Sequence, residues 1–329
     1  MTLTDDQLDR LLIAANPAPP QEFAVPSAQD IALRERIIRG DLAPRRAPRR
    51  RGIWAAGLTT AIACGAIVAL IAVNVLAPDQ RAVALTPPPL SYTSPEPLPT
   101  VIRDAQTALA EGNGPAQANH VEYVTWGWSI DMSEEHIEVI PQEITSDWTA
   151  EGGSVTTIVA GQSFWTDDER PEGLGESPYE PGDLIDRVVM TPEQFNIPPA
   201  TAALSGSSRD DLAAALAPYV EDDPNPTSGE LATAIGSLLS LWTLTDEQHA
   251  TLLDMLVDAG GVTVLGQTTD RLGRDVVGLR VSEPFNPLYR ITVLVSRDTG
   301  RIVGMEDELM EPLDFIPAGV TGYTLWDVG

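Results

Sequence analysis

The residues between 52 and 78 form one uncharged, largely apolar run that begins well inside the chain. A helix needs about 20 apolar residues to cross the hydrocarbon core of a bilayer. A secretory signal has a shorter apolar core near the N-terminus, and Pro78 is a poor residue to follow a cleavage site at Ala77. The run therefore predicts an uncleaved transmembrane signal anchor, with a buried helix of a globular core as the alternative.

Basic residues flank the N-terminal end of this run and predict its orientation. The topology-determining set is Arg45, Arg46, Arg49, Arg50 and Arg51. Positively charged flanks stay in the cytosol. We therefore expect a single-pass protein of the cell membrane, with a cytosolic N-terminus and an extracytoplasmic C-terminal part.

Small residues recur every four positions along the run, at Gly57, Ala61, Gly65 and Ala69. Such a stripe lets two membrane helices approach closely, which predicts a weak homodimer through the transmembrane helix. General alanine richness explains the same pattern and remains the alternative.

The cytosolic segment 1–51 shows two short amphipathic patterns. Thr4 and Gln7 have the spacing of a capping box, and Ser27 is a second candidate cap. The candidate cytosolic partner face consists of Leu8, Leu11, Leu12, Ile31, Ile37 and Ile38. Helices this short bury little apolar surface alone. The segment is expected to bind a cytosolic partner, to lie loosely on the membrane, or to remain a weakly ordered tail.

The charge is distributed unevenly along the chain. Residues 1–51 carry nine Arg and seven acids, whereas residues 79–329 carry eleven Arg and 41 acids. So acidic a segment repels a phosphate backbone, which argues against nucleic-acid binding. The chain has no lysine, which excludes Schiff-base and P-loop lysine chemistry, and its one cysteine, Cys64, excludes an intrachain disulfide.

The extracytoplasmic part is expected to comprise a Pro-rich extended tether, 79–99, with an edge strand as the alternative for its middle, and an α+β domain, 100–329. The patterns predict a helix at 100–111 and strands at 120–132, 136–148 and 154–165, with a break at Pro141. Helices at 210–219, 230–242 and 245–260 follow an acidic loop. Hairpins turn at Asp270–Gly273 and Arg297–Gly300, and a strand at 319–328 closes the sheet. This order predicts a curved antiparallel sheet covered by helices on one face.

A search for catalytic chemistry gives no catalytic, cofactor-binding or metal-ligating residues. The three histidines His120, His136 and His249 form no zinc-binding spacing. The acids 167–169 lack the spacing of a calcium loop. A carboxylate pair of an envelope hydrolase is a remote alternative. We expect no enzyme and no cofactor.

The aromatic residues on the predicted strands are more informative. The candidate apolar ligand pocket consists of Tyr123, Val124, Trp126, Trp128 and Trp165. Alternation places Trp126 and Trp128 on one strand face. Two interpretations remain: these side chains are core packed under the helices, or they line a pocket between sheet and helices that holds a lipid or acyl chain.

The layout resembles an uncharacterised family of actinobacterial single-pass membrane proteins. The resemblance covers nearly the whole chain and is carried by "LLIAANP", the Arg-flanked anchor, "TPPPLSYT", "YVTWGW", "VLGQTTDRLGRDVVGL" and "VSRDTGRIVGMEDE". It implies an outer domain with a lipoprotein-carrier or sigma-regulator (LolA/RseB-like) fold, and an association with sigma factors. None of these motifs is catalytic.

The sequence thus predicts a membrane-anchored, non-enzymatic envelope protein. It would sense or bind a lipid, a lipoprotein or a protein partner, and a cytosolic sigma factor is the partner that the resemblance implies. The alternative is a tethered lipid or lipoprotein carrier without a signalling role.

Overall fold

The computed structural model describes residues 87, 89–127, 129–131, 136–138, 141–162, 179–220, 225–282, 286–312 and 318–328. All of them belong to the second of the two units into which the chain divides, Ala56–Gly329. The predicted cytosolic helices and the predicted anchor at 52–78 lie outside the described residues. Within the described part, no helix combines the length and the apolarity needed to cross a bilayer.

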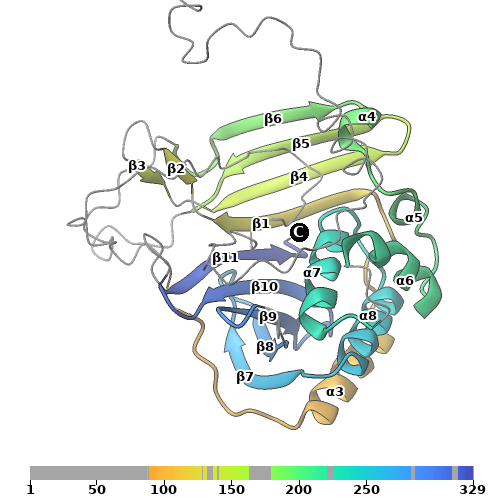
Figure 1. Ribbon diagram of the computed structural model, residues 1–329, viewed down its shortest axis with the longest axis vertical. Coiled ribbons are helices and arrows are strands. Elements are labelled where there is room, and N and C mark those ends of the chain that lie inside the picture. Colours follow the sequence, from red (N-terminus) through yellow and green to blue (C-terminus); the bar gives the residue numbers. More distant parts are fainter. Residues whose placement is uncertain are drawn as a thin grey trace, which may run out of the picture. The chain divides into compact units, whose positions relative to one another are not determined.

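One curved antiparallel sheet of nine strands runs through the domain (Figure 1), in the order β6-β5-β4-β1-β11-β10-β9-β8-β7. Its strands are β1 (His120–Gly127), β4 (Gln142–Thr149), β5 (Gly153–Ala160), β6 (Leu184–Met190), β7 (Thr263–Thr269), β8 (Asp275–Arg280), β9 (Tyr289–Ser296), β10 (Ile302–Leu309) and β11 (Gly319–Trp326). Two short strands, β2 (Ser129–Asp131) and β3 (His136–Glu138), pair separately. The predicted α+β class is confirmed.

Both predicted hairpins are present, and their turns show why the sequence forms them. At the β7–β8 turn, Asp270 Oδ1 accepts bonds from the Leu272 and Arg274 backbone N–H groups, both at 2.9 Å. Gly273 adopts φ +83°, a left-handed conformation that suits glycine. Local side-chain chemistry therefore encodes this turn.

The strand predictions need correction at three points. Residues 120–132 and 136–148 do not each form one strand, because β1 ends at Gly127, Ser129–Asp131 pairs with His136–Glu138, and β4 begins only at Gln142. The strand β6 was not predicted, and it lies at an edge of the sheet with Leu184 and Val189 exposed. The last strand, β11, does not close the sheet, because it pairs with β1 on one side and β10 on the other.

The helices follow the predictions more closely. The structure has α3 (Leu98–Glu111), α4 (Pro192–Phe195), α5 (Pro199–Ala202), α6 (Arg209–Leu216), η1 (Ala217–Tyr219), α7 (Ser228–Leu239) and α8 (Asp246–Asp258). The α3 helix begins inside the segment predicted as a tether, and α4 and α5 were not predicted. Capping boxes at Thr227 and Thr245 start α7 and α8, since each hydroxyl accepts an otherwise unpaired backbone N–H.

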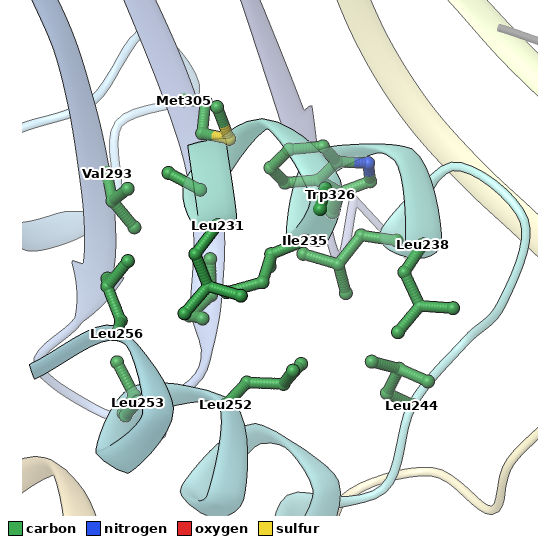
Figure 2. Packing of buried hydrophobic residues seen from close by; sticks show 14 of the residues in the cluster. Leu231, Ile235, Leu238, Leu244, Leu252, Leu253, Leu256, Val293, Met305 and Trp326 are labelled. Atoms are coloured by element: carbon green, nitrogen blue, oxygen red, sulfur yellow. The ribbon is translucent and has the colours of Figure 1, made fainter. Parts of the chain in front are cut away.

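The main core lies between α7, α8 and one face of the sheet (Figure 2). Leu231, Ile235 and Leu238 of α7 meet α8 leucines and the sheet residues Val293, Met305 and Trp326. Leu252, Leu253 and Leu256 of α8 are fully buried. Each buried leucine contributes about 1.5–3 kcal/mol by leaving water, so this helix–sheet contact is a major source of stability.

A buried arginine ties the helical layer to the end of the sheet. Arg301 is 3% exposed. Its guanidinium donates to Asp246 Oδ1 at 2.8 Å, to Asp327 Oδ2 at 2.5 Å and to the Leu244 carbonyl at 2.9 Å. Beside it, the Ile302 backbone N–H donates to His249 Nδ1 at 3.2 Å. These contacts join β10 and the residue after β11 to the start of α8.

Candidate binding face

The second apolar cluster lies on the face of the sheet opposite α7 and α8, which we call the distal face. Alternation along the strands shows the opposition: Val277 belongs to the helix-side core, whereas the neighbouring Val276 belongs to the second cluster. The distal cluster consists of Val124, Trp126, Val276, Leu294, Val303, Val320, Tyr323 and Leu325, with Leu90 packed against it.

A mixed row of side chains crosses five strands of the distal face. Arg280 on β8 is registered with Thr292 on β9, and Thr292 with Glu306 on β10. Glu306 in turn faces Tyr323 on β11, and Tyr323 faces Trp126 on β1. Residues directly opposite on neighbouring strands have Cβ atoms about 4.5–5.5 Å apart. The row therefore places charged, hydroxyl and aromatic groups side by side on an otherwise apolar face.

A buried ion pair forms the polar centre of this face. Arg271, from the β7–β8 turn, donates to Glu306 Oε2 from Nε at 3.1 Å and from Nη2 at 2.6 Å. The two side chains are 10% and 7% exposed. Burial raises the pKa of Glu306 above its ordinary value, and the Arg271 charge partly offsets this shift. The pair satisfies two groups that would be costly to bury singly.

The aromatic end of the row supports the ion pair. The Arg271 guanidinium carbon lies 5.2 Å from the centroid of the Tyr323 ring. Trp126 stacks on Tyr323 with ring centroids 5.9 Å apart and an interplanar angle of 8°. Burial also raises the pKa of Tyr323 above its ordinary value. Arginine, tyrosine and tryptophan thus form a continuous stack, which is a favourable arrangement for a desolvated cation.

An extended segment, residues 89–96, crosses this region, and we call it the strap. It is anchored at the sheet edge by a pair of backbone bonds. The Thr93 N–H donates to the Gln267 carbonyl at 2.9 Å, and the Gln267 N–H donates to the Thr93 carbonyl at 2.8 Å. The Gln267 side chain also donates to Glu96 Oε1 at 2.6 Å. The strap therefore adds to the edge strand β7, in the sequence region predicted as tether or edge strand.

Two strap side chains reach the sheet surface. Leu90 packs against the distal cluster. Tyr92 fills the space above Gly278, where an added Cβ would lie 2.3 Å from the tyrosine ring. A glycine is required at this position because the ring takes the place of a side chain.

Hollows flank the strap on both sides. An open groove of about 540 Å³ is lined by Pro89, Leu90, Ser91, Thr93, Gln267, Thr268, Thr269, Arg271, Asp275 and Arg297. A smaller hollow of about 140 Å³, the strap pocket, is lined by Pro89, Leu90, Tyr92, Arg280, Arg290, Thr292, Glu306 and Glu308.

The structure separates the residues predicted to line one apolar pocket. Tyr123 points into the helix-side core, whereas Val124 and Trp126 belong to the distal cluster. The interpretation that Trp126 packs under the helices therefore needs correction, because alternation along β1 turns it to the other face. Trp128 and Trp165 lie outside the described residues, so their place in a ligand pocket stays a prediction.

The remaining predicted functional residues lie outside the described part of the chain. They are the topology-determining arginines 45–51 and the cytosolic partner face between Leu8 and Ile38. These stay predictions. Among the residues that the structure describes, no group of three or more His, Cys, Asp or Glu side chains is arranged to hold a metal ion.

Sequence reasoning missed Arg271, Arg280, Glu306 and Tyr92. One signal for them was present: Arg280 follows the apolar run 276–279 of β8 and Glu306 follows the apolar run 302–305 of β10, and a charge on a buried strand needs a partner. Which residues would meet could not be read from the pattern, because Arg271 and Glu306 are 35 residues apart.

Comparisons with known proteins give only distant likenesses. No family model and no curated protein matches the chain. Among solved structures, it is similar to a chain in the complex of Pseudomonas aeruginosa MucA/MucB, with 11% identity and a TM-score of 0.24, covering 69% of this chain and 54% of that one. The chain thus spans about half the length of that match.

Two further solved structures are similar to the same degree. A putative outer membrane lipoprotein-sorting protein domain from Vibrio parahaemolyticus has 11% identity and a TM-score of 0.22, covering 69% of this chain and 89% of that one. A DUF1329 family protein from Desulfovibrio piger has 12% identity and a TM-score of 0.20, covering 71% and 95%. Scores this low carry no argument about function.

Proposed function

We propose that this chain is a membrane-anchored, non-enzymatic envelope protein whose α+β domain binds a lipid or lipoprotein at the distal face. The Arg-flanked apolar run at 52–78 supports the anchor and its orientation. The cytosolic segment would bind a sigma factor, the partner that the sequence resemblance implies. Binding outside the membrane would then be coupled to the cytosolic side.

The observation that carries the binding proposal is the strap and its surroundings. The strap lies over an apolar sheet face and has a hollow on each side. It is also the part of the described domain closest in sequence to the predicted anchor. Ligand sites are usually concave and hold polar groups that fix the ligand's orientation. In both hollows Pro89 and Leu90 supply apolar lining, and the other lining residues are mainly polar.

Site-specific crosslinking tests the binding surface. A photoreactive phenylalanine analogue is placed at Ser91, an exposed strap residue, in the full chain in its native membrane. Glu151, an exposed residue of the β4–β5 turn, is the matched control position. We expect lipid or lipoprotein adducts from position 91 in excess over position 151. Equal adducts at both positions would refute a strap-centred site, and protein adducts alone would replace the lipid by a protein partner.

Topology and signalling need separate tests. A reporter that works only outside the cytosol, fused after Gly329, should be active. Activity of a cytosol-only reporter fused at the same position would disprove the predicted orientation.

For the cytosolic side, Leu11→Asp combined with Ile37→Asp should abolish capture of a sigma factor by the full chain. If removal of residues 1–44 changes no cellular response, the protein is instead a tethered lipid or lipoprotein carrier without a signalling role.

A further inference from the structure

The distal cluster is covered. Its eight residues are each at most 8% exposed, and the strap residue Leu90 packs against them. The hollows beside the strap are lined mainly by polar residues, with Pro89 and Leu90 as their apolar members. An acyl chain gains free energy by leaving water for apolar surface. The described part of this face offers little such surface, so a lipid bound here would first require the strap to move.

The strap has a defined seat on the sheet. Gly266 on β7 and Gly278 on β8 make room for it. An added Cβ at Gly266 would lie 2.4 Å from the Thr93 carbonyl oxygen, and one at Gly278 would lie 2.3 Å from the Tyr92 ring. A glycine inside a strand often marks the close approach of another segment. The sequence therefore encodes a closed position for the strap.

The strap is held to the sheet at both of its ends. At one end, the Thr93 and Gln267 backbones exchange two hydrogen bonds. At the other end, the strap backbone reaches the buried ion pair: burial raises the pKa of Glu306, and the Arg271 charge and a backbone hydrogen bond from Leu90 partly offset this rise. The closed strap is thus fixed at the edge strand β7 and at β10.

The closed position also has two local costs. Tyr92 Oη is a buried atom without a hydrogen-bond partner among the described residues, and a buried hydroxyl without a partner loses the free energy of its hydration. Ser94 adopts φ +54°, a left-handed conformation that is unfavourable for a residue with a side chain. Both costs are relieved when the strap leaves the sheet, because the hydroxyl then meets water and the backbone relaxes. The strap should therefore detach more easily than the paired strands beneath it.

We propose that the strap is a lid that detaches from the sheet as one unit and uncovers the distal cluster for the ligand. In the open state an acyl chain takes the place of Leu90 on the cluster. In the closed state Leu90 fills this place, so the strap and the ligand compete for the same apolar surface. The lid deepens the proposed function and rests on it, because it regulates access to the same site.

A reversible disulfide across the strap tests this gating. Thr93→Cys and Gln267→Cys are introduced into the full chain, with Cys64→Ser to remove the native thiol. A hydrogen-bonded antiparallel pair has Cα atoms about 5.5 Å apart, a distance that a disulfide can bridge. With the photoreactive residue at position 91, lipid adducts in the native membrane should fall about fivefold or more on oxidation and return on reduction. The single variant Thr93→Cys, treated in the same way, is the control and should not respond.

Hydrogen exchange of the full chain in neutral detergent tests detachment without any ligand. The Gln267 amide, which donates to the Thr93 carbonyl, reports one end of the strap, whereas Leu90 lies at the other. If the strap detaches as one unit, Leu90→Ala should speed exchange of the Gln267 amide about tenfold, because the lost apolar contact destabilises the whole closed position. Ser91→Ala, at the exposed neighbouring residue, is the matched control and should leave this exchange unchanged. The amides of β8, which is paired on both sides, should keep their rates in both variants.

The outcomes distinguish the lid from the proposed function. Equal adducts at position 91 in oxidised and reduced protein would overturn the lid, while lipid binding at the strap would stand. Absence of adducts in both states would refute the lipid site, and the exchange rates would then decide the lid by themselves. A Gln267 amide that does not respond to Leu90→Ala, or that exchanges as slowly as the amides of β8, would show that the strap does not detach as a unit and would overturn the lid.

Discussion

Arg271 and Glu306 meet across the distal face, 2.6 Å apart at Nη2 and Oε2, although one lies in the β7–β8 turn and the other inside β10. The pair joins the turn of one hairpin to the middle of the sheet. The pair also borders both hollows beside the strap, since Arg271 lines the open groove and Glu306 lines the strap pocket.

Removal of one partner should be far more costly than removal of both. Arg271→Met leaves Glu306 buried without its counter-charge, and we expect a loss of about 3–5 kcal/mol in the free energy of unfolding at pH 7. The double variant Arg271→Met, Glu306→Leu should recover most of this loss. Urea denaturation measures all three proteins, and additive effects in the double variant would contradict a coupled pair.

The same variant should depend on pH in a defined direction. The pKa of Glu306 is raised by burial, so the folded state holds this proton more tightly than the unfolded state. Its contribution to stability is fully present below the unfolded pKa and is lost as the pH rises through the folded pKa. Loss of Arg271 raises the folded pKa further. The deficit of Arg271→Met relative to wild type should therefore be smaller at pH 4 than at pH 7.

Trp126 should behave as a buried core residue of the distal face. It is 2% exposed and stacks on Tyr323. Trp126→Ala is expected to cost about 3–5 kcal/mol, whereas Leu184→Ala at the exposed edge strand should change stability by about 0.5 kcal/mol or less. Thermal or denaturant unfolding compares the two, and a Trp126→Ala protein as stable as wild type would show that this side chain is not packed core.

His249 should make the fold sensitive to acid. Burial, with the charge of Arg301 adding to it, lowers the pKa of His249 well below its ordinary value. Below about pH 6.5 the unfolded chain therefore binds a proton that the folded chain does not, and stability falls as the pH decreases from about 7 to 5. In His249→Asn the amide oxygen can still accept from the Ile302 N–H, so a flatter stability profile is expected.

His120 is the matched control for this profile. Its hydrogen bond to Asp147 raises the pKa of His120. Its contribution is therefore present below the unfolded pKa and is lost as the pH rises, opposite in sign to that of His249. His120→Asn should leave the acid-induced loss of stability at least as steep as in wild type. Equal slopes for wild type and His249→Asn would mean that His249 is not the group responsible.

Gly278 should control how firmly the strap lies on the sheet. In Gly278→Ala the new Cβ meets the Tyr92 ring, and overpacking of this kind costs about 1–3 kcal/mol. Hydrogen exchange of the Thr93 amide, which is bonded to Gln267, should become faster. Tyr92→Ala removes the ring, so adding Gly278→Ala to that variant should cost little. A full additional cost in the double variant would place the clash elsewhere.

Local patterns determined much of the architecture of the domain. The helices α7 and α8 begin within two residues of their predicted starts, and the turns Asp270–Gly273 and Arg297–Gly300 lie where the sequence places them. In each case, groups within a few residues satisfy one another's hydrogen bonds, so the short-range sequence contains the information. The order of strands, helices and strands likewise sufficed to predict an antiparallel sheet with helices on one face.

Tertiary structure alone decided the placement of β11 and the composition of the distal face. The pattern of residues 319–328 predicts a strand but does not name its neighbours, and β11 pairs with β1 across nearly 200 residues of chain. That choice of register puts Tyr323 between Trp126 and Glu306, and brings Arg271 to the same place. Alternation along one strand says which side chains share a face, but only pairing between distant strands determines which of them meet.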